Sequence, residues 1–158
     1  MPDDDIMTAV SAALAQGQAG DRAGARLALE TLWDRTGTDG DALHRCTIAH
    51  CLADLQESVA DELAWDQRAL AAAGVLTDER AQQQDPRWTV QALLPSLHIN
   101  LADAYRRSGR FAEARPHLTD AVAATCALPD DEYGATILMG IDKVRAALDA
   151  GSTAPLQP

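Results

Sequence analysis

The stretch PSLHINLADAYRRSGRFAEARPHLTDA, residues 95–121, decides the fold of this chain. Its apolar residues recur every three or four positions, which is the period of an amphipathic α-helix and not that of a β-strand. Gly109 lies near the middle and permits the left-handed backbone geometry that ends one helix before the next begins. The stretch therefore predicts two helices joined by a short turn.

The distribution of small and large side chains predicts that these two helices pack closely. Small residues allow two helix backbones to approach each other, and large residues beside them fill the remaining space. The small residues at the expected contact are Ala102, Ala114 and Ala121, and the large residues around them are Tyr105, Phe111 and Leu118. A single hairpin of this kind cannot bury its apolar stripe alone, so we expect several hairpins to stack.

The hairpin resembles a repeat of the tetratricopeptide (TPR) family. The residues that carry the resemblance are His98, which replaces the usual Trp, and Leu101, Ala102, Tyr105, Gly109, Phe111, Ala114, Leu118 and Ala121. Residues 20–29 and residues 57–70 are similar to the part of this hairpin that begins at Gly109, since in each a short turn is followed by the start of an amphipathic helix. The resemblance implies an all-α, right-handed stack of about three TPR-like hairpins with a C-terminal capping helix. Many alanines, and arginine in place of lysine, favour a small bacterial, actinobacterial-looking member of the family.

The rest of the chain also follows the helical period. Helices are predicted over 4–18, 22–35, 42–56, 59–73, 88–108 and 111–127, with a last one that starts at 129 and ends at Gly151. Residues 77–84 also have helical character, and Pro86 should end that segment. We expect a single domain over residues 1–150 and a disordered tail over residues 151–158.

Composition excludes several classes of function. The net charge of −11 repels phosphate, so nucleic acids and anionic membranes are poor partners. No run approaches the roughly 20 apolar residues of a membrane span. Three cysteines and an acidic N-terminal segment unlike a signal peptide predict a cytoplasmic protein. No catalytic or phosphate-binding motif is present, so we expect neither an enzyme nor a cofactor.

The hypothesis that follows is a non-catalytic protein-protein interaction module. Its concave surface would bind a peptide or protein, preferably a basic one because the chain is acidic. The candidate partner-binding residues are Ser96, Ile99, Asn100, Asp103, Arg106 and Arg107, together with Asp61, Trp65 and Asp66. Trp65 fits either an interaction anchor or a residue packed on a neighbouring hairpin. Uncovered apolar edges also favour a homodimer.

The alternative hypothesis is a metal- or small-ligand-sensing protein. Cys46 and His50 lie four residues apart on the third predicted helix, so both could bind one metal ion. A third ligand would have to come from Cys126, His98 or an acidic residue. His98 fits either a ligand contact or a core histidine that is hydrogen-bonded to a neighbour, whereas His117 falls in a stretch typical of a surface.

Overall fold

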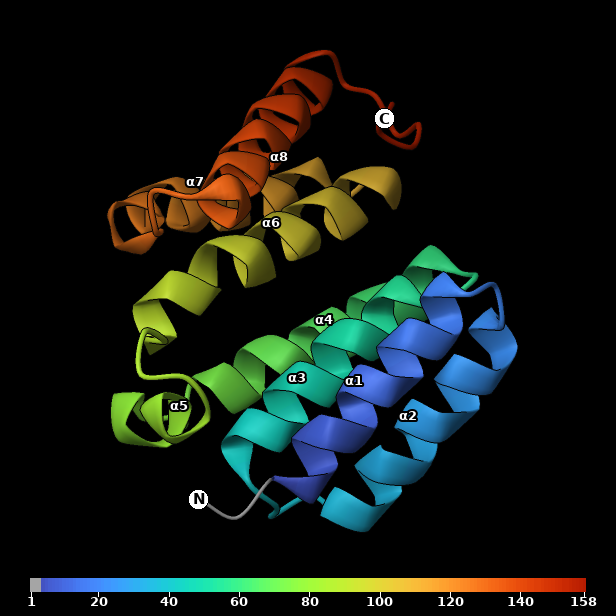
Figure 1. Ribbon diagram of the computed structural model, residues 1–158. Helices are drawn as coiled ribbons and strands as arrows, with labels where there is room; N and C mark the ends of the chain where they lie inside the picture. Colours follow the sequence, from blue (N-terminus) through green and yellow to red (C-terminus); the bar gives the residue numbers. More distant parts are fainter. Residues whose placement is uncertain (1–3) are drawn as a thin grey trace. The chain divides into compact units, whose positions relative to one another are not determined.

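The computed structural model describes residues 4–158, and within that range it contains eight α-helices, one 3-10 helix and no β-strand (Figure 1). The chain divides after Pro86 into a first and a second compact unit. The single domain expected over residues 1–150 stays a prediction. The division follows from the helix-free residues 85–89, where Pro86 interrupts the backbone hydrogen bonding and the chain leaves one core for the next.

The first unit consists of two helical hairpins and a short fifth helix. Its helices are α1 (Asp5–Gln18), α2 (Arg22–Thr36), α3 (Ala42–Asp54), α4 (Val59–Ala73) and α5 (Asp78–Gln84). Helix α1 packs along α2, α3 packs along α4, and α2 also contacts α3. One cluster of buried side chains joins the first three helices, and it comprises Val10, Ala13, Leu29, Leu32, Ile48, Cys51 and Leu52.

Side-chain caps determine where the helices of the first unit begin. Asp4, Asp21 and Asp41 each accept a backbone N–H of the first turn of α1, α2 and α3 respectively. Ser58 accepts the N–H of Asp61 at the start of α4. These caps satisfy N–H groups that have no partner inside the helix.

The second unit is a helical hairpin covered by a third helix. It contains α6 (Val90–Arg107), α7 (Phe111–Ala123), a 3-10 helix η1 (Thr125–Ala127) and α8 (Glu132–Asp149). The three alanines predicted at the hairpin contact are completely buried, and Gly109 has a φ of 74° in the turn. Helix α8 packs on both α6 and α7 and buries Ile141, Val144 and Leu148.

The end of the predicted helix over 111–127 is wrong. Helix α7 ends at Ala123, and the chain then tightens into η1, where the Thr125 hydroxyl donates to the Val122 carbonyl at 2.7 Å. Such 3-10 turns are common where an α-helix ends, because they satisfy the last carbonyl groups. Cys126 lies exposed in this turn.

Residues 151–158, predicted as a disordered tail, are held against the second unit. The buried guanidinium of Arg106 donates to the carbonyl oxygens of Ser152 at 2.7 Å and Ala154 at 2.8 Å. The Lys143 ammonium donates to the Gln157 carbonyl at 3.2 Å. Main-chain acceptors leave no pattern in the order of side chains, so this contact could not be predicted from the sequence.

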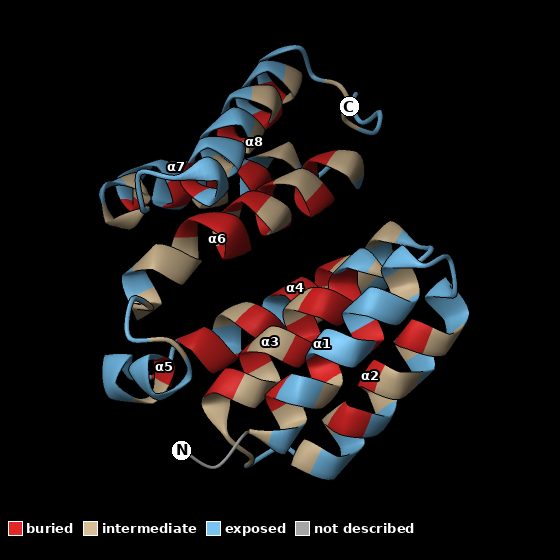
Figure 2. Cartoon of the chain, viewed as in Figure 1, coloured by how far each residue is buried: buried red, intermediate tan, exposed pale blue. Residues whose placement is uncertain are grey.

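Burial follows the helical period in both units. Figure 2 shows buried residues in stripes along the helices, with exposed residues on the other side of the same helices. This is the pattern expected of amphipathic helices around a core. Within residues 4–158 no helix combines the length and the apolar character needed to cross a bilayer.

Candidate functional site

Three of the six candidate residues on α6 do not lie on the surface that the sequence predicted. Ser96 and Ile99 are buried, and Arg106 has no exposed area. Asp103 accepts hydrogen bonds from both Arg106 and Arg107, at 2.6 and 2.8 Å. Helix α6 packs on both other α-helices of its unit, so much of its circumference is covered. The half-exposed Asn100 stays a candidate for contact with a partner.

The candidates on α4 also differ from one another. Asp66 is 2% exposed, so it lies inside the unit and not on the surface where the sequence predicted it. Asp61 is exposed but accepts a hydrogen bond from the Ser58 hydroxyl at the helix start. Trp65 is half-buried and packs against the core cluster of the first unit. Of these three residues, Trp65 has the strongest case for contact with a partner.

Trp65 belongs to a group of four side chains that we call the tryptophan surface: Trp33, Arg45, Trp65 and Arg68. The indole rings of Trp33 and Trp65 meet edge to face with 5.1 Å between centroids. The guanidinium of Arg45 lies 5.6 Å from the Trp33 centroid, and that of Arg68 lies 4.2 Å from the Trp65 centroid. Neither arginine forms an ion pair with any residue in the described range 4–158.

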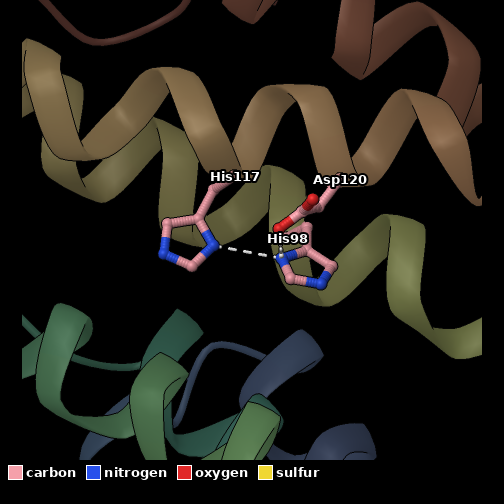
Figure 3. Close-up of side chains that lie close together, drawn as sticks. All are labelled: His98, His117 and Asp120. Carbon is pink, nitrogen blue, oxygen red and sulfur yellow. Dashed lines mark hydrogen bonds and ion pairs between the residues drawn. The ribbon is translucent and has the colours of Figure 1, made fainter.

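A second group of side chains lies on the α6–α7 hairpin, and we call it the histidine cluster: His98, His117 and Asp120. His98 comes from α6, and the other two come from α7, where a spacing of three residues puts them on one face. Figure 3 shows the three side chains converging. The two Nδ1 atoms lie 3.0 Å apart, and His98 Nδ1 lies 4.0 Å from Asp120 Oδ2.

The surroundings of the histidine cluster favour the neutral form of both imidazoles. Burial lowers the pKa of His98, and the Asp120 carboxylate offsets only part of this effect. Burial also lowers the pKa of His117, and the neighbouring His98 lowers it further. One neutral ring donates an Nδ1–H to the Nδ1 of the other. Neutral imidazole is also the form that binds metal ions.

Aromatic stacking fixes the plane of His117. Its ring lies parallel to that of Tyr105, with 5.5 Å between centroids and 11° between planes. Arg110 covers the Tyr105 ring with its guanidinium 4.7 Å from the centroid. His98 has a side chain that is only 13% exposed, whereas the Asp120 side chain is 59% exposed. The cluster is therefore ordered on its inner side and open to solvent at the carboxylate.

The predicted pair Cys46 and His50 lies in a different environment. Cys46 is 4% exposed, and burial raises the pKa of its thiol to about 11. In the metal-free protein, burial therefore disfavours the thiolate form of Cys46. Within residues 4–158, the histidine cluster is the only group of three His, Cys, Asp or Glu side chains whose ligand atoms lie within 4.8 Å of one another.

Sequence reasoning considered His98 but missed His117 and Asp120. The available signal was the hairpin itself, because His98 lies about three helical turns before Gly109 and His117 about two turns after it. Residues at comparable distances from the turn of an antiparallel hairpin face each other.

Comparison of the chain with protein-family models, with curated proteins and with solved structures gives no match.

Proposed function

We propose that this chain is a non-catalytic protein-interaction module built from TPR-like helical hairpins. The supporting features are its paired helices with alanines at the contact, and the residues by which the α6–α7 hairpin resembles the family. The observation that carries the proposal is the tryptophan surface. Two half-buried indoles side by side, each with an arginine stacked on it, have the composition of an interaction hot spot, which is rich in Trp and Arg.

The chemistry of the tryptophan surface defines the partner that it suits. An arginine stacked on an indole keeps its in-plane N–H groups available for hydrogen bonds to an anion or a carbonyl. The partner is therefore a peptide or helix that presents an apolar side chain to the indoles and a carboxylate to the arginines. The net charge of −11 attracts basic segments to the chain as a whole. The arginines of the tryptophan surface, in contrast, favour an acidic group at the point of contact.

Capture of partners by cross-linking and mass spectrometry tests the proposal. We expect Trp65→Ala and Arg68→Gln to reduce capture of the same protein by at least about tenfold, because each removes part of one hot spot. Matched controls are Trp88→Ala, which changes the third tryptophan, and Arg26→Gln, which changes an arginine paired with Glu30 in α2.

The result that contradicts the proposal is equal capture by the Trp65 and control variants, or no specific capture by the unmodified chain at low and moderate salt. Sedimentation velocity over a range of concentrations identifies the case in which the partner is a second copy of this chain. In that case the Trp65→Ala variant sediments as a monomer.

A further inference from the structure

We propose that His98, His117 and Asp120 form a binding site for a divalent transition-metal ion of the Zn²⁺ class. This inference goes beyond the proposed interaction function, because it concerns a different unit and different residues. It depends on the arrangement of ligand atoms in the α6–α7 hairpin.

The distances between ligand atoms fit one metal ion. A tetrahedral Zn²⁺ site with bonds of about 2.0–2.1 Å places its ligand atoms about 3.3 Å apart. The Nδ1 atoms of His98 and His117 are 3.0 Å apart, and His98 Nδ1 lies 4.0 Å from Asp120 Oδ2. These values lie on either side of the ideal one, so small side-chain rotations bring the three atoms to ligand positions.

The ligand types decide which metal ions suit the site. Two imidazoles and one carboxylate favour Zn²⁺ and its neighbours in the first transition row, whereas Mg²⁺ and Ca²⁺ prefer a shell made of oxygen atoms. Three protein ligands leave a fourth position for water or for a ligand atom from another molecule. Because the Asp120 side chain is 59% exposed, the cluster can be reached from solvent.

The charges around the cluster also favour a cation. Within residues 4–158, Asp120 forms no ion pair with an arginine or a lysine, and its nearest basic partner is the His98 ring. The site therefore has one carboxylate and two imidazole rings, and no arginine or lysine of residues 4–158 pairs with that carboxylate. A divalent ion would supply the positive charge that such a group lacks.

Metal binding needs only a proton shift within one imidazole. The ring that donates its Nδ1–H in the present hydrogen bond would carry that proton on Nε2 instead, so that both Nδ1 lone pairs face the ion. Tyr105, stacked on His117, holds that ring in the plane that directs its Nδ1 toward the cluster. The bound ion would thereby cross-link α6 to α7 within the hairpin.

Binding is tested on the full chain after removal of metal with a chelator. Equilibrium dialysis against ZnCl₂ with elemental analysis measures stoichiometry, and isothermal titration calorimetry measures affinity. We expect the unmodified chain to bind one Zn²⁺ ion. The Asp120→Asn variant should bind Zn²⁺ with an affinity at least about tenfold weaker, and the double variant His98→Gln with His117→Gln should not bind it at this site. Binding of Co²⁺ in place of Zn²⁺ should give visible absorption bands that disappear in the same variants.

Three control variants make the assignment specific. Asp130→Asn removes an exposed carboxylate from the same unit, and His44→Gln removes an imidazole that lies beside carboxylates in the first unit. Cys46→Ser removes the thiol of the pair predicted from the sequence. All three should bind Zn²⁺ like the unmodified chain.

The proposal is overturned if the unmodified chain binds no stoichiometric Zn²⁺, or if the double variant binds it as well as the controls do. Loss in Cys46→Ser with retention in the double variant would assign the metal to Cys46 and His50 instead. Circular dichroism checks that the variants fold. If the double variant does not fold, ¹⁵N NMR of the unmodified chain decides, because Zn²⁺ must shift the Nδ1 signals of His98 and His117 and not those of His44 or His50.

Discussion

The two units bring an imidazole and carboxylates together with different consequences. In the first unit, His44 Nε2 lies 2.7 Å from Asp4 Oδ2, and Arg80 from α5 pairs with Asp4 at 2.9 Å and with Asp41 at 2.7 Å. In the second unit the buried arginine, Arg106, pairs with Asp103 and the tail and not with the histidine cluster. The position of one arginine therefore decides whether the carboxylate of such a cluster already has a cationic partner within the protein.

The pKa of Asp4 shows how completely Arg80 and His44 satisfy the first cluster. Burial alone would raise this pKa, but hydrogen bonds from His44, from the Met7 N–H and from Arg80 outweigh burial and lower it to about 2. The same balance lowers the pKa of Asp41, for which the Arg80 hydrogen bond is the main opposing effect. The cluster is therefore a structural junction between the starts of α1 and α3 and helix α5.

The largest effect is expected from Arg106→Met in the second unit. This change leaves the Ser152 and Ala154 carbonyls without their buried donor and removes one partner of Asp103, so it should cost about 3 kcal/mol of unfolding free energy. Urea denaturation measures the loss, and limited proteolysis should show faster cleavage after residue 151. The control Arg145→Met, which removes an exposed pair with Asp142, should cost less than about 1 kcal/mol. Equal losses in the two variants would contradict the proposed role of Arg106.

A smaller effect is expected from Arg80→Met in the first unit. At pH 7 it should cost about 1–2 kcal/mol, because the pairs it removes are partly exposed. The lowered pKa of Asp4 stabilises the fold above about pH 4, and this contribution is lost as the pH falls toward 2. Urea denaturation at several pH values should therefore show the two proteins converging below pH 4. A difference that stays constant from pH 7 to pH 2 would show that Arg80 does not act through these carboxylates.

The smallest losses of stability are expected from one conservative substitution in each cluster, measured in the absence of metal. These substitutions compare the two clusters most directly. Asp41→Asn keeps the helix cap but loses the charge that Arg80 binds, so it should cost about 1 kcal/mol. Asp120→Asn should cost less than about 0.5 kcal/mol, because that carboxylate is 59% exposed and binds no arginine or lysine in residues 4–158. Thermal unfolding in chelator measures both. A larger loss at Asp120 would mean that its charge already has a structural role.

Much of the fold was predictable because it depends on local patterns. The recurrence of apolar residues every three or four positions located the helices. The division after Pro86 was not predicted, since it depends on how each half of the chain buries its own core. The tail was missed because Arg106 binds it through main-chain carbonyls, which every sequence has.

The candidate sites were harder to predict because they combine residues from different helices. Trp65 was considered as an interaction anchor, but its neighbours Trp33 and Arg45 come from α2 and α3. His98 and His117 meet only through the register of the hairpin. Residue spacing within a single helix favoured Cys46 and His50 as a metal-binding pair. That spacing does not show how deeply Cys46 is buried, and burial disfavours its thiolate form.

The distribution of the three thiols offers a practical consequence. Cys46 and Cys51 are buried, and burial raises their pKa values to about 11 and about 12. Cys126 in η1 is exposed. At neutral pH a maleimide dye should therefore attach at Cys126 alone, so a fluorophore can be placed on the native chain without replacing any residue.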